Sequence, residues 1–529
     1  MVEADGRHLV PGLLDGHMHV ESGMLTVTEF VRAVLPHGTT GMFIDPHEIA
    51  NVFGLDGVRM VVDEAAHQPI HVWVQVPSCV PSAPGLETPG ASIGPADVAE
   101  AIRWPGVIGL GEMMSYPSVF QSEAQVHEEM AEARRAGSVI GGHYASPDLG
   151  LPFHGYVAGG IEDDHEGTRL EDAVARARQG MKVMMRLGSA WHDVASQIRA
   201  VTELGLDPRH FLLVTDDSHS ETLVHDGHMD RVVRHAIGQG ASPMTVLQMA
   251  TLNTAEHFGV ARDVGQIAPG RYADLLLVRD LESFEAEAVF ARGRLAAERG
   301  RLLLDLPRYI YPERAKTSVH LARPLRPEDF VVRSPAEGKA RVHVIGVIEN
   351  QAPTRHLEMV LVSAGGELRL DAVDDLAKVA LVERHRGSGR IQMGFVSGFG
   401  FKERCAFGST VAHDSHHLIL VGTDEASMAA AGNELARVGG GQVVVRDGRV
   451  TALVELPIAG LISEERAEVV AEKARRVLEA IRDCGCTLNN ANMQLSLLAL
   501  VVIPELRISD LGLVDVSRMA FIPVAEPAV

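Results

Sequence analysis

The feature that most constrains the fold of this 529-residue chain is an alternation of short apolar runs and helical segments between residues 10 and 220. Eight apolar runs end in polar residues: GLLDGHMH, TTGMFIDPHE, HVWVQVPSC, GVIGLGEM, SVIGGHYA, AGGIEDDHE, KVMMRLGSA and HFLLVTDDSH. Helical patterns lie between them at residues 27–37, 57–68, 95–103, 122–136, 170–179 and 195–204. Alternating strands and helices predict a parallel sheet, and eight repeats predict a closed, TIM-like (β/α)8 barrel. A doubly wound sheet is the alternative, but the Gly-rich loop that follows its first strand is absent from this sequence.

The rest of the sequence indicates two further domains. Residues 226–259 are rich in helix, with one helix at 243–258, whereas residues 266–295 read as short antiparallel strands with Pro-Gly and Arg-Gly turns. The best helix of the last part lies at residues 463–484. We expect these domains: a remnant of a small β-domain at 1–10, the barrel at 11–262, the small β-domain at 263–306, a Pro- and Arg-rich linker at 307–327, and a C-terminal α/β domain at 328–529.

The composition restricts the partners of the chain. A net charge of −22 argues against binding to nucleic acid or to an anionic membrane, and only 5% of the residues are aromatic. A small, uncharged or cationic substrate fits better. Four cysteines exclude a disulfide scaffold, and we interpret Cys484 and Cys486 as ordinary reduced thiols. No signal peptide is visible and the longest apolar stretch, residues 495–503, is too short for a bilayer, so we expect a cytoplasmic protein.

Two histidines at the end of the first strand indicate a metal site. His17 and His19 follow the apolar residues Leu13 and Leu14 in PGLLDGHMHVESGM. Side chains two residues apart on a strand point to the same face, so both imidazoles can approach one metal ion. Imidazole suits zinc, iron and manganese, and a catalytic metal keeps a position open for water. The motif therefore predicts a metal-dependent hydrolase.

Four more strand ends complete a two-metal site. Glu112 ends the fourth strand, His143 the fifth, His165 the sixth and Asp216 the eighth. The active sites of such barrels lie at the carboxyl ends of the strands. A carboxylate such as Glu112 can bridge two cations, and two cations make hydroxide available at neutral pH. Asp216 can then accept a proton from the water and return it to the leaving group.

Other polar residues beside these positions have roles that the sequence leaves open. Five of them either orient the ligands or hold an additional metal: Asp45, His47, Glu48, Asp217 and His219. For the first three, a plain loop role after Pro46 is a further alternative. Glu21 and Ser22 either contact the substrate or cap the next helix. The run AHDSHH, with His413, Asp414, Ser415 and His416, either reaches over the barrel mouth or forms a surface turn.

Long motifs of the chain resemble those of bacterial adenine deaminases in the amidohydrolase superfamily. They include PGLLDGHMHVESGM, LPHGTTGMFIDPHEIANVFG, VIGLGEMM, EDDHEGT, VTDDSH, MATLNTAEHFGV, GQIAPGRYADLLLV, DLESFE, ERHRGSGRIQMGFVSGFG, STVAHDSHHLILVG and IPELRISDLGLVDV. The resemblance covers nearly the whole chain. It implies a barrel, a small β-domain split in sequence around it, and an extra C-terminal domain. Family members carry a longer segment before the first strand, so we expect either a late start codon or an incomplete β-domain here.

The resemblance also implies a chemistry. It predicts two divalent metal ions, manganese or iron(II), and the hydrolysis of adenine to hypoxanthine and ammonia in purine salvage. Many relatives bridge their metals with a carbamylated lysine, whereas Glu112 occupies the corresponding place here. The motifs of the cysteine-rich zinc deaminases are missing from this sequence. We expect adenine and water as the reactants, and a homo-oligomer.

Two other functions compete with this interpretation. The first is a related hydrolase that acts on a cyclic amide or on another nucleobase; Glu112 and the length of the motifs argue against it. The second is an inactive paralogue that only binds a ligand. Loss of a metal ligand would favour an inactive protein, yet the sequence retains the complete set of six: His17, His19, Glu112, His143, His165 and Asp216.

Overall fold

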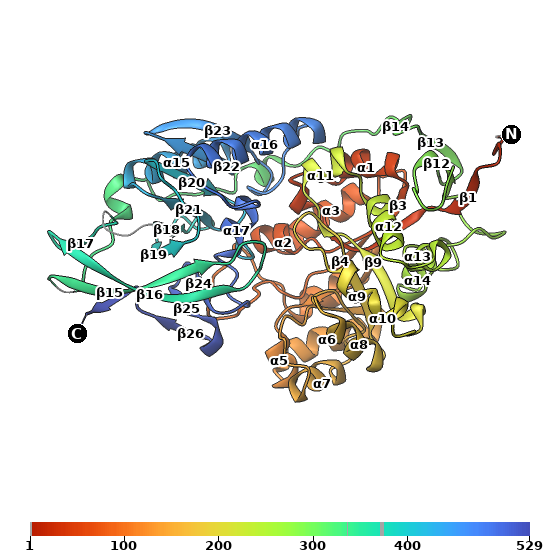
Figure 1. Cartoon of the computed structure of the whole chain (residues 1–529), viewed down its shortest axis with the longest axis horizontal. Helices are drawn as coiled ribbons and strands as arrows, with labels where there is room; N and C mark the ends of the chain where they lie inside the picture. Colours follow the sequence, from red (N-terminus) through yellow and green to blue (C-terminus); the bar gives the residue numbers. More distant parts are fainter. Residues whose placement is uncertain (1–2, 336, 371–374, 529) are drawn as a thin grey trace.

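The computed structural model describes residues 3–335, 337–370 and 375–528. Figure 1 shows an elongated molecule, with the barrel in the middle and right of the view and the C-terminal domain on the left. The N-terminus lies beside a small sheet at one end, and the C-terminus lies at the opposite end. Among the described residues, no helix is both long enough and apolar enough to cross a membrane.

Parallel strands form the barrel in two hydrogen-bonded groups. The first group contains β2 (Leu13–His19), β3 (Thr39–Ile44), β4 (His71–Val76), β5 (Val107–Met113), β6 (Val139–Gly142) and β10 (Asp216–Asp217). The second contains β7 (Asp163–Asp164), β8 (Lys182–Arg186) and β9 (Phe211–Val214). The N–H of Glu162 donates to the carbonyl oxygen of Ile140 at 2.9 Å and joins the groups on one side. On the other side Asp216 pairs with Met18, which closes the barrel and confirms the predicted fold.

The strands are buried on both faces because helices cover the outside of the barrel. All residues of β2 and β3 are buried, as expected for apolar runs in a parallel sheet. The helices are α1 (Val27–Val34), α2 (His47–Phe53), α3 (Leu55–Ala65), α4 (Pro95–Ala101), α5 (Tyr116–Phe120), α6 (Ala124–Ala136), α7 (Leu151–Ala158), α8 (Leu170–Arg178), α9 (Val194–Gln197), α10 (Arg199–Thr202), α11 (Ser220–His225), α12 (Met229–Gly238), α13 (Pro243–Met249) and α14 (Leu252–His257). Short 3-10 turns occupy Glu21–Gly23, Leu35–His37 and Pro208–His210.

Two predicted helices are divided in the structure. The helix expected at residues 195–204 is split into α9 and α10, which meet at Ile198. The helix expected at 243–258 is split into α13 and α14, because Thr251 leaves the helical conformation with φ −143° and ψ −84°. The hydroxyl of Thr251 donates to the carbonyl oxygen of Leu247 at 2.5 Å, so this side chain offers the backbone a competing hydrogen bond.

A small antiparallel sheet lies beside the barrel. Its order is β1 (His8–Pro11), β11 (Leu275–Val278), β12 (Ala286–Ala291), β13 (Arg294–Glu298) and β14 (Arg301–Leu302). The first strand of the chain therefore pairs with a strand that follows the barrel, with His8 opposite Val278. This pairing supports the proposal that residues 1–10 and 263–306 belong to one small β-domain, although the domain limits themselves stay predictions.

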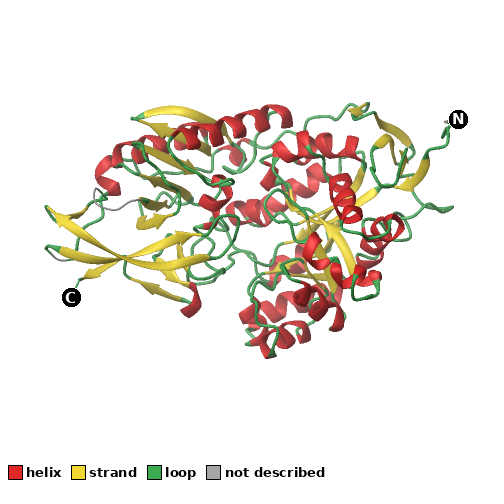
Figure 2. Ribbon diagram, viewed as in Figure 1, coloured by secondary structure: helices red, strands yellow, loops and turns green. Residues whose placement is uncertain are grey.

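The C-terminal part contains a large mixed sheet and a small antiparallel one (Figure 2). The large sheet has the order β17 (Glu367–Leu368), β16 (Thr354–Ala364), β15 (Lys339–Val347), β19 (Ile391–Ser397), β18 (Leu376–Val382), β21 (Leu418–Gly422), β20 (Cys405–Ser409), β22 (Gly441–Arg446) and β23 (Arg449–Glu455), with β27 (Ala525–Pro527) beside β15. The small sheet has β24 (Leu506–Ile508), β25 (Leu513–Asp515) and β26 (Ala520–Ile522). The helices are α15 (Glu425–Val438), α16 (Ala467–Asp483) and α17 (Ala491–Leu497), with 3-10 turns at Glu313–Lys316, Pro327–Phe330 and Val516–Arg518.

The C-terminal part packs against the barrel. The helix expected at 463–484 begins later, at Ala467, because Ser463 pairs with Leu25 in a β-bridge. The N–H of Ser463 also donates to the carbonyl oxygen of Met24 at 2.9 Å. In Figure 1, α16 and α17 lie on the side of the C-terminal part that faces the barrel. This contact brings two regions that are distant in sequence to the mouth of the barrel.

Candidate metal centre

The six candidate ligands converge at the carboxyl ends of the barrel strands. All are buried, with exposed fractions of 2% to 5%: His17, His19, Glu112, His143, His165 and Asp216. The imidazole of His17 stacks on that of His165, with ring centroids 4.0 Å apart. The structure therefore brings together residues from five different strand ends, although their roles as ligands remain a prediction.

Glu112 occupies the middle of the centre. Its Oε2 lies 2.6 Å from Nδ1 of His143 and 3.3 Å from Nε2 of His165. Its Oε1 lies 3.4 Å from Nε2 of His19, so the two oxygens face opposite halves of the cluster. Burial alone would raise the pKa of the Glu112 carboxyl, but hydrogen bonds with the surrounding histidines hold it well below its usual range. Glu112 is thus an anion placed between two groups of imidazoles.

Asp216 faces the other half of the centre in a strained backbone conformation. Its Oδ1 lies 3.2 Å from Nε2 of His19 and 3.7 Å from Nε2 of His17. Its φ is +60°, a left-handed conformation that is uncommon for residues other than glycine. Such strain costs on the order of 1–3 kcal/mol and persists only where the surroundings hold it. The pairing of Asp216 with Met18 is one such restraint.

Asp45 positions two of the candidate ligands. The backbone carbonyl of Asp45 lies 2.8 Å from Nδ1 of His19, which leaves Nε2 of that ring free for a metal. The side-chain Oδ2 of Asp45 accepts a hydrogen bond from the N–H of Glu112 at 2.8 Å. A Cβ atom on Gly111 would come within 2.1 Å of this Oδ2, so the approach requires glycine. Asp45 therefore contacts two of the candidate ligands from behind, as a residue that orients them would.

His143 is held from the outside of the barrel. Its backbone N–H donates to the hydroxyl of Tyr156 at 2.8 Å, and this hydroxyl donates to the carbonyl oxygen of Met113 at 3.0 Å. The next residue is fixed as well, because the N–H of Tyr144 donates to Asp164 at 2.6 Å. These hydrogen bonds fix the end of β6 relative to β5 and β7, and so set the distance between His143 and Glu112.

The structure adds two residues that the sequence did not single out. The guanidinium of Arg186, at the end of β8, donates to Oδ2 of Asp216 at 3.0 Å and to Glu166 at 3.2 Å. Oε1 of Glu166 in turn lies 3.3 Å from Nε2 of His143. Burial would raise the pKa of Glu166, but Arg186 and His143 lower it to about 2. The available signal was their place in predicted strands, since Arg186 lies within KVMMRLGSA and Glu166 ends AGGIEDDHE.

The donor set fits divalent metal ions. Within the described residues, several buried atoms of the centre have no hydrogen-bond partner: Nε2 of His17, Oε1 of Glu112 and Nε2 of His143. Three overlapping groups hold their ligand atoms within 4.8 Å of one another: His17, Glu112 and His165; His17, His19 and Asp216; and His19, His47 and Glu112. Buried polar groups are otherwise almost always paired, so these free lone pairs indicate a bound cation.

The loop after β20 reaches the barrel from the C-terminal part. His413 and Asp414 line the space around Glu112 and His165, and Asp414 is only 1% exposed. Ser415 and His416 in the same loop are also buried. The surface turn considered for this segment is therefore wrong, and the loop closes the mouth of the barrel.

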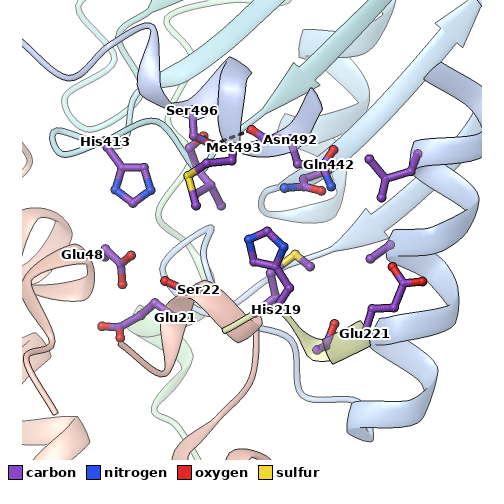
Figure 3. A pocket seen from close by; sticks show the side chains of 15 residues that line it. Glu21, Ser22, Glu48, His219, Glu221, His413, Gln442, Asn492, Met493 and Ser496 are labelled. Carbon is purple, nitrogen blue, oxygen red and sulfur yellow. Dashed lines mark hydrogen bonds between the residues drawn. The ribbon is translucent and has the colours of Figure 1, made fainter. Parts of the chain in front are cut away.

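A pocket next to the centre contains four of the other uncertain residues. Figure 3 shows Glu21, Ser22 and Glu48 on the barrel side, facing His413 on the opposite side, with His219 close by. The hydroxyl of Ser22 donates to Asp217, and Nε1 of Trp191 donates to the other oxygen of Asp217 at 3.1 Å. Asp217 and His219 belong to none of the possible metal-binding groups found among the described residues.

A larger cavity adjoins the centre. The space at the centre itself is about 50 Å³ and is bordered by apolar side chains of the C-terminal part, including Leu497 and Leu500. The adjoining cavity has a volume of about 990 Å³, and Glu166 and Trp191 border both spaces. Both spaces combine a few apolar side chains with many polar and charged ones, a lining that can accept a small polar molecule.

Comparisons with known proteins agree with this geometry. The amidohydrolase family matches residues 8–296, and the adenine deaminase C-terminal domain matches residues 351–520. The chain belongs to the amidohydrolase family. "Adenine deaminase 3" of Rhizobium meliloti is 61% identical over 98% of this chain and 87% of its own length. An adenine deaminase of Mesorhizobium japonicum is 62% identical over 98% and 86%, and one of Moorella thermoacetica is 52% identical over 97% and 86%.

Membership in the amidohydrolase family explains why metal-binding side chains gather at this end of the barrel. Amidohydrolases use divalent metal at the carboxyl ends of their barrel strands, which is where the free lone pairs of this chain lie. The matched C-terminal domain includes the loop with His413 and Asp414, so both matched regions contribute side chains to one centre. The identity of the metal does not follow from these contacts.

Proposed function

We propose that this amidohydrolase is an adenine deaminase of purine salvage, which hydrolyses adenine to hypoxanthine and ammonia. One observation carries the proposal. A buried glutamate lies between imidazoles at the barrel mouth of a chain that is 61% identical to an adenine deaminase over 98% of its length. The adenine deaminase C-terminal domain closes the same site.

The ligand set divides into two overlapping halves around Glu112. His17, His19 and Asp216 would hold one divalent ion, and His143 and His165 the other, with one oxygen of Glu112 toward each. Manganese or iron(II) suits a set of imidazoles and carboxylates. When bound, such a pair lowers the pKa of a water molecule and makes hydroxide available near neutral pH.

Asp216 is the group best placed to move protons. The reaction forms a C–O bond at C6 of adenine and breaks the C–N bond of the amine, which must leave as ammonia with an added proton. Asp216 accepts the proton of the attacking water and transfers it to the departing amine. Arg186 holds Oδ2 of Asp216 at 3.0 Å, so that Oδ1 stays directed toward the reacting side. Arg186 therefore acts as a positioning residue.

The surroundings of the centre suit a flat, uncharged base. Leu497 and Leu500 offer apolar surface to the ring faces, and the polar edge of the base can be bound by Glu21 and Ser22. Burial raises the pKa of the neighbouring Glu48 well above its usual range, and the charge of Glu21 adds to this effect. A protonated Glu48 would donate a hydrogen bond to a ring nitrogen. We further propose a homo-oligomer in the cytoplasm.

The experiment is a panel of ammonia-release assays. Protein expressed in manganese-supplemented, iron-depleted medium is analysed for metal and is then given adenine, guanine, cytosine and hydantoin in separate reactions. We expect at least two equivalents of metal per chain. Ammonia should be released from adenine and from none of the other three compounds. Turnover of hydantoin or guanine with no turnover of adenine would contradict the proposed substrate, and metal-replete protein without any turnover would favour an inactive paralogue.

A further inference from the structure

One buried carboxylate near the centre is unexplained by the two-metal site. Asp414 comes from the C-terminal loop after β20 and is 1% exposed. Neither of its carboxylate oxygens has a hydrogen-bond partner among the described residues. A carboxylate that loses its water without gaining donors is costly, so such groups in proteins are paired or bind metal. Asp414 therefore needs a positive charge beside it, from a metal ion or from protonated histidines.

Two histidines flank this carboxylate from different parts of the chain. Nδ1 of His413 lies 3.3 Å from Oδ1 of Asp414, and Nε2 of His47 lies 3.7 Å from the same oxygen. His47 begins α2 in the barrel, whereas His413 belongs to the C-terminal loop. All three side chains are buried, and their ligand atoms lie within 4.8 Å of one another.

The spacing is that of ligands around one metal ion. Bonds of about 2.0–2.1 Å in a tetrahedral site put neighbouring ligand atoms roughly 3.3–3.4 Å apart. The separation of 3.3 Å equals this spacing, and that of 3.7 Å is somewhat longer and also exceeds a good hydrogen bond. Two imidazoles and one carboxylate, with further positions open, are a frequent ligand set for divalent zinc, manganese and iron.

We propose that His47, His413 and Asp414 bind a third divalent cation, which links the C-terminal domain to the metal centre of the barrel. Nδ1 of His47 lies 3.1 Å from Oε1 of Glu112, so one imidazole contacts both the third site and the bridging carboxylate. A cation at this place neutralises Asp414 and fixes the loop that closes the barrel mouth. The inference does not depend on the identity of the substrate, since the third site uses none of the groups assigned to proton transfer.

The test is a metal count on the whole protein. Purified wild-type protein, loaded with manganese and freed of excess metal, should contain three equivalents per chain by mass spectrometry. Asp414→Asn should contain two, because it removes the charged ligand of the third site only. The matched control is Asp510→Asn, another buried aspartate of the C-terminal part that contacts the barrel, through Thr88. The control should keep three equivalents.

Several outcomes would overturn the proposal. Two equivalents in both the wild type and Asp414→Asn would show that protonated histidines, not a cation, neutralise Asp414. Loss of two equivalents in Asp414→Asn would place this residue in the central pair instead. A second measurement covers a variant that fails to fold: manganese anomalous scattering from wild-type crystals should give a peak between His47, His413 and Asp414, and no peak there would refute the site. Neither measurement uses deaminase activity, so failure of the proposed function remains distinguishable.

Discussion

Two buried polar clusters lie next to each other on strand β2, and they differ in how their hydrogen bonds are satisfied. The upper cluster is the metal centre, and the lower cluster surrounds Asp15. Asp15 accepts hydrogen bonds from the N–H of Thr215 at 3.1 Å and from its hydroxyl at 2.6 Å. Nε2 of His228 lies 3.1 Å from the same carboxylate, and Nδ1 of that ring lies 2.9 Å from the hydroxyl of Thr39. Two residues further along the strand, Nε2 of His17 has no partner among the described residues.

The contrast separates a structural cluster from a site that binds a ligand. The lower cluster is complete within the protein and fastens β2 to the eighth strand, so its removal should cost stability. In the upper cluster, several buried nitrogen and oxygen atoms have free lone pairs. The metal-free protein would be more stable if these atoms had hydrogen-bond partners. Proteins retain such unsatisfied groups where they serve function. Substitutions in the upper cluster should therefore remove metal and activity, and those in the lower one should weaken folding.

The largest effect is expected at Glu112. Glu112→Gln keeps the size of the side chain but removes the charge that two cations share, so it should lose at least one metal equivalent and most of the rate. Metal analysis and adenine kinetics on the same preparation check this. A variant that retains its full metal content and deaminates adenine normally would place the bridging group elsewhere.

Asp216 should show a smaller loss that is confined to the chemical step. Asn is tolerated at φ +60°, so Asp216→Asn should keep the backbone and remove the acid–base group. General acid–base catalysis is worth about 10²–10⁴-fold, and we expect kcat and kcat/KM to fall together by at least that factor. Adenine should still bind. The measurement is steady-state kinetics on metal-replete protein.

The neighbouring Asp217→Asn is the control for this variant. Asp217 is bound by Ser22 and Trp191, and it borders the space of the metal centre without belonging to any candidate group of metal ligands found among the described residues. Its replacement should have the milder effect on kcat. If Asp217→Asn were inactive and Asp216→Asn nearly normal, the assigned proton shuttle would be wrong by one residue.

Asp15 tests the other half of the comparison. Asp15→Asn turns one acceptor of the lower cluster into a donor that faces the N–H and hydroxyl of Thr215. We expect a loss on the order of 3 kcal/mol in the free energy of unfolding. Urea unfolding of the metal-free proteins measures it, with Glu112→Gln as the comparison variant, in which the loss should be smaller. Equal losses in both variants would remove the distinction between the clusters.

The sequence predicted the parts of the molecule that depend on local pattern. The strand ends with His17, Glu112 and His143 were identifiable because apolar runs end there in metal-binding residue types. The sequence left Asp414 open between the barrel mouth and a surface turn, because its closeness to His47 depends on the packing of two regions far apart in sequence. Arg186 was missed because arginine is not a metal ligand, and its role as a partner of Asp216 appears only when β8 and β10 are placed side by side.

The smallest predicted effect concerns Glu129, which shares one feature with the metal centre: a buried side-chain oxygen without a hydrogen-bond partner among the described residues. It lies in α6 and is 1% exposed, and its Oε2 has no hydrogen-bond partner within the described part of the chain. Oε1 accepts a hydrogen bond from Gln125 at 3.0 Å. Glu129 belongs to none of the groups of possible metal ligands found among the described residues. We therefore expect Glu129 to lower the stability of the folded state without binding a metal ion.

This cost should depend on pH. Burial raises the pKa of Glu129 from 4.5 to about 7, whereas in the unfolded chain the carboxyl ionises at its ordinary pKa. Below pH 4.5 both states are protonated and the difference vanishes; between about 4.5 and 7 the folded state holds the proton longer, so its stability falls as the pH rises. Glu129→Gln cannot ionise and should be more stable than the wild type at pH 8 by on the order of 2–3 kcal/mol, with the difference shrinking toward pH 5. Urea unfolding of both proteins at the two pH values measures this. A difference that is the same at both would mean that Glu129 is satisfied by a group or water that its described neighbours do not reveal, and an unpartnered oxygen would then no longer distinguish the metal centre.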